Sequence, residues 1–269
     1  MAFTNPIYDL FWDSLSQKEQ EVYALLSIPA WFNEDIANGL ATRFNSSVTD
    51  NFYDVVREID FVSRFEKKGW NFEPRFSEFL LAKAETLYQT RLTQIHEYLY
   101  SYYTTPKDGI SLARKREETY LSFYHLIHID PVEAKSAILN SLDTSDEKFL
   151  IPVLRSLVYI CQLPPVKFEG DSFYTFLKLY LSAIENRNDK DVLKGIVEQV
   201  ENIREGTGDE THVLFQKQLM LLLVRLYESA YPNKPKNILK KLKKLKHRLN
   251  HLTGGYSNDE DGDIEAVPA

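Results

Sequence analysis

Apolar residues recur every three or four positions along most of this chain, and short breaks divide the pattern into helix-sized segments. The breaks hold the proline, glycine and asparagine residues that stop helices, as in "TTPKDG", "QLPP" and "YPNKP". The pattern is continuous over 74–105, and further helices are expected over 110–129, 131–142, 145–162, 171–186, 189–203, 210–230 and 236–252. Helices of about 12 to 20 residues with short loops predict stacked antiparallel pairs, so we expect an irregular, TPR-like helical-repeat array.

The first 80 residues carry a different pattern, of three short helices and then a hairpin. Ser16 and Glu19 form a capping box at the start of the first helix, and "NEDIANGLATRF" and "SSVTDNFYDVVREID" predict the second and third. In "FVSRFEKKGWNFEP" two alternating runs flank a turn, which predicts a β-hairpin. Three helices followed by a hairpin are typical of a winged helix.

The expected fold is therefore all-α with a minor β-hairpin. A winged-helix-like domain is expected over 1–83 and a helical-repeat domain over 84–253. Residues 254–269 hold five acids and no base, which predicts a disordered acidic tail. The 43% hydrophobic and 13% aromatic content is sufficient for a buried core.

Residues 16–129 resemble the region that follows the nucleotide-binding core in STAND-type signalling ATPases. The resemblance rests on "LSQKEQEVYALLSIPAWFNEDIANGLA", "GWNFEPRFSEFLL", "RLTQIHEYLYSYY" and "EETYLSFYHLIHIDPVEAKSAI". It implies a winged helix leading into helical repeats, acting as an interaction or regulatory module beside an ATPase partner. Two departures matter: Glu73 replaces the family's nucleotide-contacting histidine, and no G-x-x-x-x-G-K-[ST] is present. Nucleotide binding is therefore not carried over, and no cofactor is expected.

The chain offers little that indicates catalysis. It has no G-x-S-x-G elbow and no H-E-x-x-H, so we expect no enzymatic activity. Its single cysteine, Cys161, excludes an intramolecular disulfide, and its apolar neighbours predict a buried, inert thiol. His125 and His128 share a helical face near Asp130, which could serve a metal, but no second ligand cluster accompanies them. We expect structural histidines with a polar contact.

Two segments are candidates for binding another protein. Tyr98, Tyr102 and Tyr103 lie within one helical turn of each other and serve either helix packing or a partner. The segment 236–252 combines a continuous apolar stripe with seven Lys/Arg and no carboxylate. The stripe predicts the closing helix of the array, made of Ile238, Leu242, Leu245, Leu249 and Leu252. Its cations are candidates for docking an acidic partner, namely Lys240, Lys241, Lys244 and Arg248.

Nucleic-acid binding is the alternative function, as a winged-helix regulator with a helical oligomerisation or sensor domain. The favourable cations around the hairpin are Arg64, Lys67, Lys68 and Arg75. The third helix, which would enter the major groove, opposes Arg57 alone with Asp50, Asp54, Glu58 and Asp60. Carboxylates facing phosphates are repelled, and the net charge of the chain is −7. A protein partner is therefore the preferred prediction.

No apolar run reaches the roughly 18 residues that a membrane helix needs. The first residues have neither a basic region nor a clean apolar region, so no signal peptide is expected. The sequence predicts a soluble, cytoplasmic, non-enzymatic protein that binds a protein partner on its helical-repeat surface, with no membrane contact.

Overall fold

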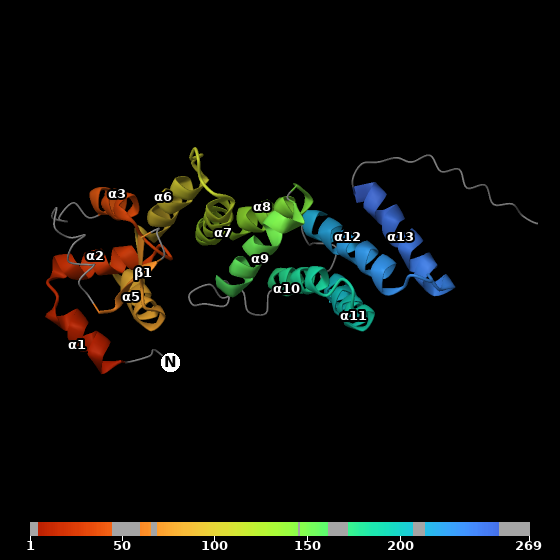
Figure 1. Cartoon of the computed structure of the whole chain (residues 1–269), viewed down its shortest axis with the longest axis horizontal. Helices are drawn as coiled ribbons and strands as arrows, with labels where there is room; N and C mark the ends of the chain where they lie inside the picture. The colour runs from red at the N-terminus through yellow and green to blue at the C-terminus, as the bar shows by residue number, and fades with distance from the viewer. Residues whose placement is uncertain are drawn as a thin grey trace, which may run out of the picture. The chain divides into compact units, whose positions relative to one another are not determined.

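The computed structural model describes residues 5–44, 60–65, 69–144, 146–160, 172–206 and 213–252, and most of them are α-helical (Figure 1). Within these residues the β-structure is a two-stranded antiparallel sheet and one isolated bridge. The predicted mostly helical fold with a minor hairpin is confirmed. No helix in the described ranges is long and apolar enough to cross a membrane.

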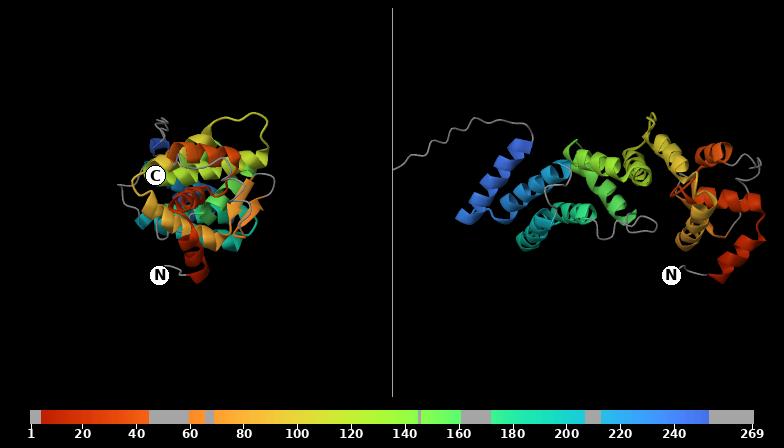
Figure 2. Two further views of the ribbon diagram at one scale, coloured as in Figure 1. Left: turned by 90° about the vertical axis from the view of Figure 1, so that its left-hand side faces the viewer. Right: turned by 180° about the vertical axis from the view of Figure 1, so that it is seen from behind.

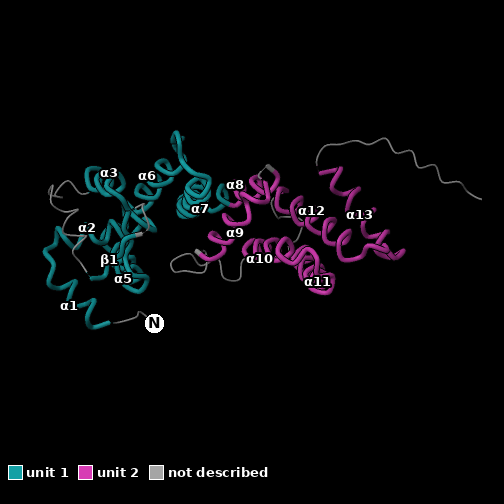
Figure 3. Tube along the Cα trace, viewed as in Figure 1, with its two compact units in different colours: residues 1–134, 163–166 teal, residues 135–162, 167–269 magenta. Residues whose placement is uncertain are grey.

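The chain divides into two compact units (Figure 3). Unit 1 comprises residues 1–134 with 163–166, and unit 2 comprises residues 135–162 with 167–269. This division falls at 134/135, whereas the sequence pattern predicts a boundary at 83/84. The physical reason is a shared core, because one apolar cluster runs from Tyr8 in the first helix to Leu121. The helices just after the hairpin therefore belong with those before it.

Unit 1 contains most of the described aromatic side chains and the sheet. Its elements are α1 (Pro6–Ser14), α2 (Gln17–Ser27), α3 (Glu34–Phe44), β1 (Val62–Phe65), β2 (Gly69–Phe72), α5 (Pro74–Leu87), α6 (Leu92–Thr104) and α7 (Leu112–Ile129). The predicted capping box of α2 is present, since Ser16 N donates to Glu19 Oε2 at 2.8 Å and Glu19 N to Ser16 Oγ. The helical pattern over 74–105 forms two helices, because α5 ends at Leu87 and Tyr88–Arg91 turn the chain.

The predicted hairpin is confirmed. β1 pairs antiparallel with β2, with Val62 opposite Phe72 and Arg64 opposite Trp70. Trp70 also exchanges two backbone hydrogen bonds of 2.8 Å with Phe32, so the segment before α3 adds a short third pairing. Gly69 allows this approach, because a Cβ there would lie 2.2 Å from the Phe32 carbonyl oxygen. The predicted third helix over 47–60 lies almost entirely outside the described residues.

Helix α1 is held to the hairpin and α5 by aromatic packing and one hydrogen bond. Tyr8 lies edge-on to Phe61 at 5.4 Å and against Phe76 at 5.2 Å. Its hydroxyl donates to Glu73 Oε2 at 2.7 Å. Glu73 thus has a structural contact within unit 1.

Unit 2 is a succession of helices. They are α8 (Pro131–Thr144), which begins at the end of unit 1, α9 (Glu147–Ile160), α10 (Ser172–Glu185), α11 (Lys190–Gly206), α12 (Val213–Ala230) and α13 (Lys236–Leu252). All six predicted helices are present. From α9 onward each helix packs on the next, and α13 lies alongside α12 (Figures 1 and 2). Their packed faces are apolar, as the helical spacing requires.

Candidate functional site

Helix α13 has an apolar face that packs on the rest of unit 2. Ile238, Leu242 and Leu245 are buried, which confirms the first three members of the predicted stripe. Leu249 is half-buried and Leu252 is 38% exposed, so the apolar stripe becomes accessible to solvent over the last turn of α13. The helix is therefore anchored through its first two and a half turns, as expected for a closing helix.

The two flanks of this apolar face use lysines for intramolecular contacts. Lys241 Nζ lies 2.9 Å from Glu201 Oε1 on α11 and donates to the Tyr227 hydroxyl on α12 at 3.1 Å. Burial raises the pKa of Tyr227 to about 12, and its hydrogen bond to Glu201 acts in the same direction. On the other flank Lys246 Nζ pairs with Glu228 Oε1 at 2.8 Å. Lys241, one of the predicted partner-binding residues, thus fastens α13 to unit 2.

The side of α13 opposite the apolar face carries its remaining cations, and we call this surface the outer basic face. At 100° per residue the lysines lie opposite the apolar face, and Arg248 lies next to Lys241 at the edge of this surface. Its members are Lys236, Lys240, Lys243, Lys244 and Arg248. All five are exposed, and within the described part of the chain none of them forms an ion pair. Three of the four predicted cations of this helix belong to the outer basic face.

Two histidines share the outer basic face. His247 Nε2 and His251 Nε2 lie 3.3 Å apart and both side chains are exposed. Because α13 contains no carboxylate, the outer basic face presents point charges of one sign on long side chains. Such an arrangement can bind an extended anionic surface.

The three predicted tyrosines of α6 do not form one surface. Tyr98 and Tyr102 are half-buried and line a cavity of about 840 Å³ beside α3. Tyr103 points into the core, where its ring stacks on His125 at 5.6 Å and lies edge-on to Trp31 at 6.2 Å. Tyr103 is therefore a packing residue, and only its two neighbours are accessible to a ligand.

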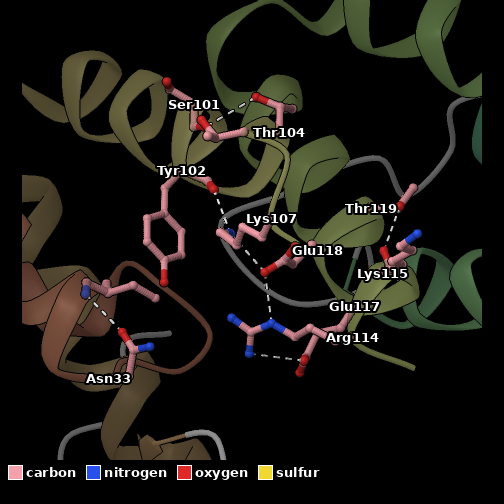
Figure 4. Close-up of polar contacts among 12 residues, drawn as sticks. Asn33, Ser101, Tyr102, Thr104, Lys107, Arg114, Lys115, Glu117, Glu118 and Thr119 are labelled. Atoms are coloured by element: carbon pink, nitrogen blue, oxygen red, sulfur yellow. Dashed lines mark hydrogen bonds and ion pairs between the residues drawn. The ribbon is translucent and has the colours of Figure 1, made fainter. Parts of the chain in front are cut away.

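A buried ionic network holds the connection between α6 and α7 (Figure 4). Glu118 Oε1 accepts from Lys107 Nζ at 2.9 Å and from Arg114 Nε at 2.8 Å, and Glu118 is only 5% exposed. The Lys107 ammonium also lies 4.1 Å from the centre of the Tyr102 ring. The helical spacing of Arg114 and Glu118 is the sequence signal for this pair, but its burial could not be read from that spacing.

A second polar cluster lies between α6 and α7. His96 Nδ1 and His125 Nδ1 are 2.8 Å apart, and the His96 ring stacks on His128 at 4.2 Å. Burial lowers the pKa of His96 and His125 well below the usual value, and it lowers the pKa of His128 to about 4. The expected polar contact exists for His125. Its partner, His96, was not singled out by the sequence pattern.

The candidate nucleic-acid residues are only partly described. Arg64 on β1 and Arg75 in the first turn of α5 are exposed, whereas Lys67 and Lys68 lie outside the described residues. Cys161 and the predicted acidic tail over 254–269 also lie outside them. Among the residues that the structure does describe, no group of three histidine, cysteine, aspartate or glutamate side chains is arranged to hold a metal ion. Comparison of this chain with protein-family models, curated proteins and solved structures gives no match.

Proposed function

We propose that this protein is a non-enzymatic interaction module that binds an acidic surface of a protein partner through the outer basic face of α13. The observation that carries the proposal is that some cations of α13 form intramolecular ion pairs and others do not. Lys241 and Lys246 pair with carboxylates of α11 and α12, while the five cations of the outer basic face are exposed and form no ion pair within the described residues. A helix that needed positive charge only for its own docking would not require the outer five.

The position of α13 in the array supports this proposal. In the described residues α13 packs mainly on α12, which leaves most of its circumference open to a partner. Helical arrays bind through such extended faces. The proposal includes the winged-helix-like reading of the N-terminal residues and the TPR-like reading of unit 2. It also includes a regulatory role beside an ATPase partner, which rests on the resemblance of residues 16–129.

A protein partner is favoured over nucleic acid by the charges elsewhere. The chain as a whole carries a net charge of −7, so an approaching polyphosphate is repelled by most of the molecule. A partner with a limited acidic patch needs to contact the outer basic face alone. Nucleic-acid binding is therefore treated as an outcome of the test.

The test uses a charge reversal of the outer basic face in the full chain, Lys240→Glu with Lys244→Glu and Arg248→Glu. The matched control reverses three exposed lysines near the starts of other helices, Lys18→Glu, Lys115→Glu and Lys190→Glu. Both proteins have the same net charge, so non-specific electrostatics are equal. Fluorescence anisotropy measures binding to a labelled ten-residue glutamate peptide and to a labelled DNA duplex.

We expect the wild-type protein to bind the glutamate peptide and the outer-face variant to bind it about 30- to 100-fold more weakly, from about 0.7–0.9 kcal/mol per reversed contact. The control variant stays within about threefold of the wild type. Equal weakening of both variants contradicts the proposal, because it assigns the binding to net charge. Tighter binding of the duplex than of the peptide at the same salt concentration also contradicts it, in favour of nucleic acid.

A further inference from the structure

A polar cavity in unit 1 lies apart from the outer basic face. It opens between the end of α3 and one face of α6 and has a volume of about 840 Å³. Two arginines, two tyrosines and one glutamate line it, together with amide and hydroxyl side chains of α6. Small-molecule sites in proteins occupy about 300–1,000 Å³. The volume alone therefore permits a small ligand, and the lining decides its chemistry.

The first arginine, Arg43 of α3, lies near the ring of Tyr98 on α6. A Cβ at Gly39 would lie 1.8 Å from the Tyr98 hydroxyl oxygen, so the glycine makes room for this ring against the backbone of α3. Arg43 lies one helical turn after Gly39, and its Cζ is 5.7 Å from the centre of the Tyr98 ring. Gly39 thus makes room for Tyr98, and the Tyr98 ring offers a contact surface to the exposed Arg43 side chain at the cavity edge.

The second arginine reaches the same end of the cavity from α6. Arg91 directly precedes α6, and its Nη1 donates to the Phe44 carbonyl, the last residue of α3, at 3.4 Å. Arg43 and Phe44 are adjacent in the chain, so Arg91 is bonded to the residue next to Arg43. A guanidinium has five N–H donors, and this single bond leaves most of those of Arg91 available. Within the described residues neither arginine is ion-paired.

The remaining lining of the cavity is largely polar and comes from α6. Glu97 lies nearly two turns along α6 from Arg91, and Gln94 and Ser101 lie close to it on the same helix. Tyr102 is fixed beside Asn33 (Figure 4); burial raises its pKa, and the hydrogen bond to Asn33 opposes that shift. The lining of the cavity therefore carries two positive charges, one carboxylate and several neutral polar groups.

We propose that this cavity binds a small phosphate monoester that also carries an amino or hydroxyl donor. A phosphate monoester has a charge of about −1.5 to −2 at pH 7, which matches two guanidinium groups better than a single carboxylate does. Paired N–H donors of arginine also fit phosphate oxygens in bidentate geometry. Glu97 accepts from the donor of the ligand, which distinguishes a substituted phosphate ester from free phosphate. This site is independent of the proposed partner binding, since α13 belongs to unit 2.

The test measures binding of glucosamine 6-phosphate, which combines a phosphate monoester with amino and hydroxyl donors, by NMR of the arginine side-chain Nε–Hε groups in the full chain. Inorganic phosphate and glucosamine are the partial ligands. We expect glucosamine 6-phosphate to bind at least about tenfold more tightly than either, because each partial ligand loses one charged contact. The signals of Arg43 and Arg91 shift on binding, and those of the exposed Arg75 do not.

Three variants complete the test. Arg43→Ala and Arg91→Ala each weaken binding by about tenfold or more, and Glu97→Gln removes most of the preference over inorganic phosphate. Arg75→Ala is the matched control, an exposed arginine of the same unit that does not line the cavity. All four replace exposed side chains, so circular dichroism is expected to show unchanged folding. Absence of saturable binding, or equal effects of Arg75→Ala and Arg43→Ala, overturns the proposal.

Discussion

The two units of this protein differ in what their interiors contain. Unit 1 buries histidines, glutamates and serines, and unit 2 buries a single polar side chain, Gln218, among the residues that the structure describes. The ion pairs of unit 2 instead lie at its surface, as between Arg155 and Glu185, where both side chains are at least 35% exposed. Burial makes a polar group sensitive to its charge state, whereas a surface pair is screened by water. We therefore expect the stability of unit 1 to depend on pH and on the charge of its buried groups. The stability of unit 2 is expected to depend on the volume of its buried side chains.

The largest expected effect is acid destabilisation of unit 1. His96, His125 and His128 have pKa values lowered by burial, so the folded protein keeps them neutral while unfolded histidines take up protons below about pH 6.5. Stability is thus fully present above pH 6.5 and falls as pH decreases toward 4, the pKa of folded His128. Between pH 8 and pH 5 the titration of His128 alone costs about 2 kcal/mol, and His96 and His125 add to the loss in the same direction. Hydrogen exchange of α6 and α7 amides measures this loss, with α11 and α12 as the internal reference.

A histidine substitution separates this effect from general acid denaturation. His128→Leu removes one titrating group and leaves the bond between His96 and His125 in place. We expect the loss of stability between pH 8 and pH 5 in α6 and α7 to decrease by about 2 kcal/mol, the contribution of His128. An unchanged pH dependence would show that the buried histidines are not its source.

The second prediction concerns the removal of a large buried side chain from unit 2. Phe176 is fully buried and packs against Phe215 with ring centroids 5.4 Å apart. Phe176→Ala leaves a cavity and is expected to destabilise unit 2 by about 3–5 kcal/mol, equally at pH 8 and pH 6. Denaturant melts with hydrogen exchange locate the loss to α10–α12. The exposed Val192→Ala serves as the control, with an effect below about 0.5 kcal/mol.

The third prediction compares a buried carboxylate with an exposed one. Glu118→Gln removes the charge that Lys107 and Arg114 share, and about 1–3 kcal/mol is expected to be lost from unit 1. Glu185→Gln removes the partner of Arg155 in unit 2 and costs about 0–1 kcal/mol. Urea unfolding of the two variants gives both numbers. Equal losses would contradict the contrast between the two interiors.

The smallest effect concerns the docking of α13. Lys241→Ala removes the contacts with Glu201 and Tyr227 and is expected to cost about 1 kcal/mol or less. Lys240→Ala, on the outer basic face, is expected to leave stability unchanged within about 0.3 kcal/mol. Hydrogen exchange of α13 amides detects the difference. Loss of equal size in both variants would show that the outer cations also support the fold.

Much of the fold and part of the candidate site could be predicted from the sequence. The helices of unit 2, the capping box of Ser16 and the hairpin follow from local rules of spacing and turn chemistry. The stripe of Ile238, Leu242 and Leu245 identified the face by which α13 packs. The role of Lys241 could not be predicted, because Glu201 lies 40 positions away and meets it only after three helices have packed.

By itself, the sequence determined that most of the chain is helical, which residues form the apolar face of α13, and that α13 carries positive charge on its other sides. These are properties of neighbouring residues, because helical spacing fixes them within a few turns. The tertiary structure alone decided that Tyr103 is buried while Tyr98 and Tyr102 line a cavity, that His96 meets His125, and that α5–α7 share the core of the N-terminal helices. Such contacts depend on which surfaces of distant segments exclude water together, and no local pattern encodes that choice.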